Sequence, residues 1–323
     1  MEKDMCPISS LLIYIPTHTD YRLAIEQAVT IKNGLLDDSI YTRVHIHISI
    51  NGVSLNKDDR KQIADVSDSF SITTDNIGAD ANIAKGFQMA SESSFDFLWI
   101  LSANDLLKTN AISVIQQMFS QPFSQDILLF DQVESGSDCQ IEDVFKEALR
   151  GSPLGLISAV IFNTNLFKNF FSYAAQYVNT GWTQLAILNL RLVESGVLKV
   201  KKISSDQIYS LDQRTPNNVE VEFVRIGRTY ARSFFGLPAL VSMMTVGDCK
   251  RSDSIIDLWM WKNWYLIAYF KSFLDHENQI EASMYSQGIN TIRKSSLKNR
   301  ILLPLVNNSL FYSLYRRLKE FSR

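Results

Sequence analysis

Residues 9–15 read SSLLIYI, a short apolar run rich in strand-forming side chains that ends at the tripeptide PTH, residues 16–18. A continuous apolar run of this length, closed by a turn, is typical of a buried strand covered on both faces. Arg43–Ile50 (RVHIHISI) and Phe95–Leu101 (FDFLWIL) have a similar character. The first of these two ends at Asn51-Gly52. These runs predict three strands of one sheet.

Helical segments separate the predicted strands. Tyr21–Leu35, Asp80–Ala90 and Asn110–Phe119 have helical character, and Asp126–Phe130 reads as a further strand. Strands that alternate with helices at this spacing indicate βαβ units, so we expect an α/β fold with a mainly parallel sheet. In such sheets ligands bind at the carboxyl ends of the strands, where the sequence places polar clusters.

Charge divides the chain into an acidic body and a basic tail. The 323 residues are 46% hydrophobic and 20% charged, ordinary values for a folded globular protein. Residues 1–224 carry 17 Lys and Arg against 27 Asp and Glu, whereas residues 225–323 carry 15 against 7. We therefore predict an α/β domain at residues 1–225 and a mostly helical extension at residues 226–323. Apolar, aromatic and basic patterns predict helices at Ile255–Leu274 and Leu302–Phe321.

Several other classes of protein lack their signatures. Three widely spaced cysteines form no CxxC pair, which argues against a disulfide framework and a structural zinc site and suits a reducing cytoplasm. We find no signal peptide, transmembrane run, P-loop, GxGxxG or GxSxG motif. His45 and His47 share one face of a predicted strand, but no third metal ligand lies near them in sequence. The alternative is that both belong to a buried structural strand.

Four sequence blocks, taken together, carry the strongest functional signal. They are IPTH at residues 15–18, ISING at 48–52, DNIGADANIAKGFQMA at 75–90 and FLWILSANDLL at 97–107. Their order and spacing resemble the family 2 glycosyltransferases, which have the GT-A fold, over roughly residues 9–200. The resemblance is closest to the bacterial branch that builds surface polysaccharides such as O-antigen and capsule.

The resemblance implies a nucleotide-diphosphate sugar at the strand ends. The residues expected to contact it are Pro16, Thr17, His18, Asn51, Gly78, Asn82, Lys85, Asn104 and Asp105. Gly78 would allow close backbone approach to the ligand. Asn51 stands where many relatives have an Asp that reads the base. Two positions have plain alternatives, because His18 is also compatible with an ordinary polar loop and Lys85 with a solvated helix face.

The family's metal motif stands here as Ser102-Ala103-Asn104-Asp105. The resemblance makes Asp105, the only carboxylate in the tetrad, the candidate ligand for Mg²⁺ or Mn²⁺, which would neutralise the diphosphate and help it depart. Fewer carboxylates than usual imply weaker metal binding or a partly metal-independent mechanism. Alternatively, Asn104 and Asp105 simply cap the following helix.

A catalytic base is harder to place. Relatives that invert the anomeric centre use an Asp or Glu to deprotonate the acceptor hydroxyl, after a strand that Leu156–Phe162 resembles. The matching segment here, NTGWTQ at residues 179–184, has no carboxylate. Trp182 is expected to stack on a sugar and Gln184 to bind a hydroxyl at the catalytic centre. Asp131, after a predicted strand, is a substitute base, although a strand-end Asp is often a turn residue.

The expected function is transfer of a hexosyl group, with inversion, to a saccharide acceptor that the resemblance makes polyprenyl-diphosphate-linked. Basic residues of the tail, among them Arg316 and Arg317, favour peripheral contact with an anionic membrane at the inner face of the plasma membrane. The tail's apolar stripe and the acidic body disfavour a nucleic-acid partner. The alternative function is a GT-A-like nucleotide-sugar-binding or scaffolding protein without catalysis, because carboxylates are missing from both motifs.

Overall fold

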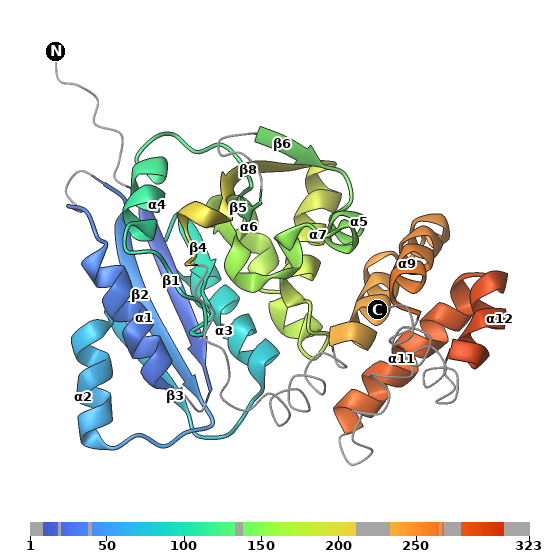
Figure 1. Cartoon of the computed structure of the whole chain (residues 1–323), viewed down its shortest axis with the longest axis horizontal. Helices are drawn as coiled ribbons and strands as arrows, with labels where there is room; N and C mark the ends of the chain where they lie inside the picture. The colour runs from blue at the N-terminus through green and yellow to red at the C-terminus, as the bar shows by residue number, and fades with distance from the viewer. Residues whose placement is uncertain are drawn as a thin grey trace, which may run out of the picture. The chain divides into compact units, whose positions relative to one another are not determined.

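The described strands form one eight-stranded sheet (Figure 1). The computed structural model describes residues 9–18, 21–37, 41–132, 138–210, 233–264, 267 and 279–306. The strand order is β3-β2-β1-β4-β7-β5-β8-β6. The strands are β1 (Ser10–Thr17), β2 (Arg43–Asn51), β3 (Ser69–Thr73), β4 (Phe97–Ile100), β5 (Ile127–Asp131), β6 (Asp138–Ile141), β7 (Val160–Asn163) and β8 (Leu198–Ser204).

The direction of each strand decides which residues meet at one edge. β1 pairs in parallel with β2 and β4, β2 with β3, and β5 with β8. β7 runs antiparallel between β4 and β5, and β6 runs antiparallel to β8. The carboxyl ends of β1–β5 and β8 therefore share one edge, and β7 begins at that same edge. This mixed, mostly parallel α/β sheet confirms the predicted fold class.

Helices connect the strands. They are α1 (Tyr21–Asn33), α2 (Lys57–Val66), α3 (Ala79–Glu92), α4 (Ala111–Phe119), α5 (Val144–Arg150), α6 (Thr164–Phe171) and α7 (Thr183–Ser195). Short 3-10 turns lie at η1 (Pro153–Gly155), η2 (Ile157–Ala159), η3 (Ala174–Tyr177) and η4 (Ser205–Gln207). Later in the chain come a helix at residues 233–244, α9 (Cys249–Asn263), α11 (Gln279–Ser295) and α12 (Leu297–Val306).

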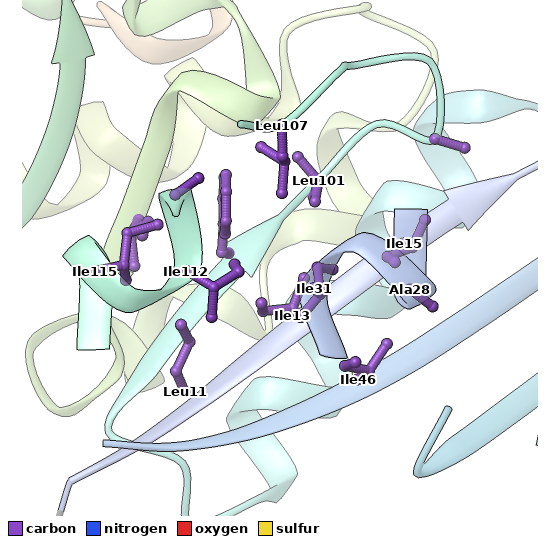
Figure 2. Packing of buried hydrophobic residues seen from close by; sticks show 14 of the residues in the cluster. Leu11, Ile13, Ile15, Ala28, Ile31, Ile46, Leu101, Leu107, Ile112 and Ile115 are labelled. Atoms are coloured by element: carbon purple, nitrogen blue, oxygen red, sulfur yellow. The ribbon is translucent and has the colours of Figure 1, made fainter. Parts of the chain in front are cut away.

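The two faces of β1 enter two different hydrophobic layers, which explains its unbroken apolar run. Leu11, Ile13 and Ile15 are fully buried in a cluster with side chains of α1, α2 and α4. Figure 2 shows Ala28 and Ile31 of α1 and two isoleucines of α4 around these residues. Because side chains alternate along a strand, the residues between them face the opposite layer.

The opposite layer is built by α3 and α6. Tyr14 of β1 lies against Gly86 of α3, where a Cβ would come within 2.7 Å of the Tyr14 ring. Glycine is therefore the residue that lets α3 approach the sheet this closely. Phe87 of α3 meets Phe162 of β7 edge to face, with ring centroids 5.3 Å apart. This packing fixes α3, which carries the predicted site residues Asn82 and Lys85 and begins directly after Gly78.

The chain divides into two compact units. The first comprises residues 1–144, 151–176 and 187–214, and the second comprises residues 145–150, 177–186 and 215–323. The predicted domain boundary at residue 225 lies outside the described residues. Within the second unit, α9 begins six residues before the predicted helix at Ile255, and α12 begins at Leu297 rather than Leu302. The rest of the predicted last helix, from residue 307, lies outside the described residues.

Close helix contacts stabilise the second unit. A Cβ on Gly288 of α11 would lie 2.5 Å from the Phe235 carbonyl oxygen, so α11 packs tightly on the helix at 233–244. Gly236 of that helix lies directly against the Thr180 carbonyl. Among the described helices, none combines the length and the apolar character needed to cross a lipid bilayer.

Candidate active site at the carboxyl edge of the sheet

The ends of β1 and β2 meet the loop that leads into α3. Thr17 is the last residue of β1, and Pro16 lies inside that strand, past the point where β4 pairs with it. A Cβ on Gly52 would come within 3.2 Å of both the His18 Nε2 atom and the Asn76 Cβ. His18, Gly52 and Asn76 therefore lie next to one another, and the side chains of His18 and Asn76 are exposed.

Asn51 positions this loop. Its side chain is 1% exposed, and its Oδ1 accepts a hydrogen bond from the Ile77 amide at 2.9 Å. Its Nδ2 donates to Asn76 Oδ1 at 3.3 Å and to the Gly78 carbonyl at 3.4 Å. Both ends of the Asn51 amide are therefore engaged with the loop. The described contacts give it the role of holding residues 76–78 beside the strand ends.

Gly78 lies where the loop turns into α3. Its φ of +82° belongs to the left-handed side of the Ramachandran plot, which favours glycine. A Cβ there would meet no atom within 4 Å, so the space beside this backbone is open. Its amide donates to the Asn76 side chain at 3.0 Å. The glycine thus leaves an accessible stretch of backbone at the amino end of a helix.

Asn82 lies inside the protein rather than facing the open edge. It is 2% exposed. Its Nδ2 donates to the carbonyls of Thr17 at 3.3 Å and Ser49 at 3.2 Å. Its Oδ1 accepts from the Ser49 hydroxyl at 2.6 Å and the Tyr14 hydroxyl at 3.1 Å. Asn82 therefore ties α3 to β1 and β2 directly beneath the candidate site.

Lys85 reaches the end of β3. Its half-buried side chain donates from Nζ to the Thr73 hydroxyl at 2.6 Å. A lysine ammonium has three donors, so this contact leaves two for a ligand. Lys85 is half-buried and bonded to Thr73, so it does not lie on a freely solvated helix face. It places a positive charge beside the strand ends.

Asp105 lies in a turn after β4, and α4 begins only at Ala111. It therefore does not cap that helix, and neither does Asn104, which is exposed. Ser102 shapes the turn: its hydroxyl accepts from the Asn104 amide at 3.2 Å, and its carbonyl accepts from the Asp105 amide at 3.2 Å. The arrangement presents one carboxylate, one amide and one hydroxyl from a single short turn.

Burial raises the pKa of the Asp105 carboxyl above its ordinary value, and a hydrogen bond from the Ser158 side chain opposes that shift. Because burial makes the charged form of this carboxylate less favourable, a nearby cation would stabilise that form more than it stabilises an exposed carboxylate. The described residues contain no group of three or more His, Cys, Asp or Glu side chains that could hold a metal ion by themselves. Any cation here would need ligands from a bound substrate and water.

Ser158 is a site residue that the sequence reasoning missed. It lies in η2, immediately before β7, and its hydroxyl accepts from the Ser102 amide at 2.9 Å while it bonds the Asp105 side chain. Its carbonyl accepts from the Trp99 indole at 2.7 Å and from the Tyr209 hydroxyl. Burial, together with the charge of Asp105, raises the pKa of Tyr209 well above its ordinary value. Ser158 thus holds in place the turn at residues 102–105, called the acidic turn below.

Asp131 ends β5 at the same edge, with β7 between it and β4. Its Oδ2 forms an ion pair with the Lys202 Nζ of β8 at 2.9 Å, and its Oδ1 accepts from the Gln132 amide at 2.8 Å. Both oxygens therefore have partners. The ion pair holds the carboxylate that would have to take up a proton from the acceptor.

Trp182 and Gln184 belong to the second unit. The Trp182 indole donates to the Ser233 carbonyl, so this ring helps to hold the helix at 233–244. Gln184 is 4% exposed. The segment before them turns sharply, because Asn179 (φ 79°) and Gly181 (φ 75°) both adopt left-handed backbone conformations.

His45 and His47 are occupied by serines of β3. The Ser69 hydroxyl lies 2.9 Å from His45 Nε2 and 2.8 Å from His47 Nδ1, and Ser71 lies 3.1 Å from His47 Nε2. His47 also stacks on Tyr14 with ring centroids 5.2 Å apart. These contacts are those of a structural strand, the second of the two interpretations of the sequence.

Comparison with known proteins identifies the fold. No protein-family model matches the chain, and no curated protein sequence matches it significantly. Among solved structures, residues 1–349 of TarS from S. aureus, a GT-A glycosyltransferase, superpose with a TM-score of 0.56 at 11% identity, over 95% of this chain and 91% of that one. The same protein in complex with UDP-GlcNAc gives 0.55 at 10% identity, over 95% and 92%. The chain therefore has a GT-A-type fold.

Proposed function

We propose that this protein transfers a sugar from a nucleotide-diphosphate sugar to a saccharide acceptor. The observation that carries the proposal is that the carboxyl ends of β1, β2, β3 and β4 lie at one edge of a GT-A-type sheet. This edge combines an open loop backbone at Gly78, the ammonium of Lys85 and the desolvated carboxylate of Asp105. In α/β sheets such an edge is where ligands bind. The UDP-GlcNAc complex of TarS, which shares the fold, points to the same class of donor.

A divalent cation fits the acidic turn. Mg²⁺ takes oxygen ligands, keeps several waters and commonly uses one or two protein carboxylates together with substrate phosphates. Asp105 would supply the carboxylate, and Asn104 and Ser102 can add an amide and a hydroxyl oxygen. When bound, the cation would neutralise the charge that develops on the diphosphate. Ser158 holds this turn through its bonds to the Ser102 amide and the Asp105 side chain.

The remaining steps fall to this chain's own residues. His18, Pro16 and Thr17 would border the nucleotide at the end of β1, with Asn51 and Asn82 holding the neighbouring backbone. Asp131 is our candidate for the base that deprotonates the acceptor hydroxyl in an inverting displacement, after release from Lys202. For Trp182 and Gln184 we retain the proposal that they meet the acceptor sugar.

We further propose that the acceptor is a lipid-linked saccharide of surface-polysaccharide synthesis and that the second unit contacts an anionic membrane. Trp261 of α9 is 71% exposed, and Ile301 of α12 is 62% exposed. The Lys298 ammonium lies 5.2 Å from the centre of the Trp261 ring. An exposed indole beside a basic side chain suits the interface of an anionic bilayer.

Vesicle flotation tests the membrane contact. With vesicles rich in phosphatidylglycerol, Lys298→Glu should reduce binding of the full chain, because it reverses one charge beside Trp261. Lys61→Glu makes the same charge change on α2 and should not reduce it. Equal binding of the two variants, or no binding by the unmodified protein, would overturn this part of the proposal.

A thermal-shift screen tests donor binding. UDP, GDP, CDP and dTDP are added with and without Mn²⁺, since a ligand that binds only the folded state must raise its stability. The proposal predicts a shift with one nucleotide that Mn²⁺ enlarges and that Asp105→Asn makes independent of metal. A shift without metal dependence would remove the cation. Binding without any donor turnover would favour the catalytically inactive nucleotide-sugar-binding alternative.

A further inference from the structure

A pocket with a mixed polar and apolar lining lies wholly within the second unit. It has a volume of about 580 Å³, within the range of about 300–1,000 Å³ that is usual for small-molecule sites. α9 contributes Ser252, Asp253 and Ile256 to its lining, and α11 contributes Gln287, Asn290 and Lys294. None of the residues assigned above to the donor site lines it. The two helices pack against each other. The end of the helix at 233–244 and the turn after it complete the lining with Ser242, Thr245, Val246 and Gly247.

Five polar side chains of this pocket have no hydrogen-bond or ion-pair partner among the described residues. Gln287, Asn290 and Lys294 are spaced three and four residues apart, which puts them on one face of α11. Within the described parts of the chain, none of these three side chains forms a hydrogen bond or an ion pair, and the same holds for Ser252 and Asp253. Other lining hydroxyls do have partners: the Thr291 hydroxyl donates to the Gln287 carbonyl at 2.8 Å, and the Thr245 hydroxyl donates to the Val241 carbonyl at 2.6 Å. Gln287, Asn290 and Lys294 are exposed, so their donors and acceptors face solvent and are available to a ligand.

The chemistry of the lining selects the ligand class. One carboxylate, from Asp253, and one ammonium, from Lys294, balance each other, so the lining favours neither a polyphosphate nor a metal ion. The amides of Gln287 and Asn290 each both donate and accept, as does a ligand hydroxyl group. Val246, which lines the pocket and is 86% exposed, adds an apolar surface of the kind that the C–H face of a sugar ring can cover.

We propose that this pocket binds a neutral saccharide unit, separately from the donor site. The proposal does not depend on sugar transfer by the first unit, because every lining residue belongs to the second. It assigns the amides of α11 to hydrogen bonds with ring hydroxyls and the α9 carboxylate to an accepting position opposite them.

Saturation-transfer NMR on the full-length protein tests the pocket directly. The probes are glucose, galactose, mannose, N-acetylglucosamine and N-acetylgalactosamine, with inorganic phosphate and UDP as competitors. We expect at least one sugar to bind, and Asn290→Ala or Gln287→Ala to weaken that binding about tenfold each, as loss of one or two hydrogen bonds implies. Neither phosphate nor UDP should displace the sugar.

Two neighbouring serines provide matched controls. Ser286→Ala on α11 and Ser254→Ala on α9 alter exposed hydroxyls outside the pocket lining and should leave binding unchanged. Alanine is the best helix former, so all four variants should fold, which melting curves verify. The proposal is overturned if none of the five sugars binds, if UDP or phosphate displaces the sugar, or if Asn290→Ala and Gln287→Ala bind as the controls do.

Discussion

Asn82→Ala separates a structural role from a ligand-binding role at the candidate site. The Asn82 side chain makes four hydrogen bonds, two to backbone carbonyls and two from hydroxyls, all in the interior. Each such bond contributes about 0.5–1.5 kcal/mol net. The Tyr14 hydroxyl would keep its bond to the residue 82 carbonyl at 3.0 Å. We therefore expect Asn82→Ala to lower the free energy of unfolding by about 3 kcal/mol.

Amide hydrogen exchange in β1 and β2 measures this loss in the first unit alone, because local and global opening are both recorded residue by residue. For a unit of this size the loss corresponds to a fall in melting temperature of roughly 6–12 °C. Asn104→Ala is the matched control, since it removes an exposed amide and should change stability by about 0.5 kcal/mol or less. A loss below about 1 kcal/mol for Asn82→Ala, combined with lost nucleotide affinity, would refute the structural role.

Three further variants test other parts of the structure. Burial lowers the pKa of His47 to about 4. In the unfolded chain this imidazole is protonated below about pH 6.5, so the free energy of unfolding should fall as the pH drops from about 6.5 to 4, by at most about 3 kcal/mol. Urea titrations of His47→Gln should lack this contribution to the pH dependence. Ser158→Ala should raise the pKa of Asp105 further, shifting Mn²⁺-dependent stabilisation to higher pH; an unchanged pH midpoint would contradict the hydrogen bond. Gly86→Ala should cost about 1–3 kcal/mol by overpacking against Tyr14, and a melting temperature equal to that of the parent protein would disprove that contact.

The central strands were predictable because a strand that is buried on both faces has an almost continuous run of apolar residues. β1, β2, β4 and β5 all coincide with predicted apolar runs. β3 and β8 were not predicted. β3 is half-buried along its whole length and reads SFSIT, and β8 reads LKVKKIS with three lysines. Strands of this kind share their polar composition with loops, and only pairing with a neighbour distinguishes them.

The sequence predicted which residues lie at the strand ends, but not how they are arranged there. Thr17, Asn51 and Asp105 lie at or just after the ends of β1, β2 and β4, because parallel strands have their carboxyl ends at one edge of the sheet. The interior position of Asn82 depends on the rotation of α3 about its axis, which Gly86 fixes against Tyr14. Ser158 was read as part of a strand. It reaches Asp105 because β7 runs antiparallel between β4 and β5, and that reversal has no local sequence signal.

Donor hydrolysis by the full-length protein tests sugar transfer most directly, since transferases slowly hydrolyse their donors. UDP-GlcNAc and the corresponding GDP, CDP and dTDP sugars are incubated with Mn²⁺, and release of the nucleoside diphosphate is followed over time. The account predicts release from one donor, and a loss of at least about 100-fold in Asp105→Asn at an unchanged melting temperature, as expected when charge stabilisation of a leaving group is removed. Full hydrolysis by Asp105→Asn, or no release from any donor, would contradict it.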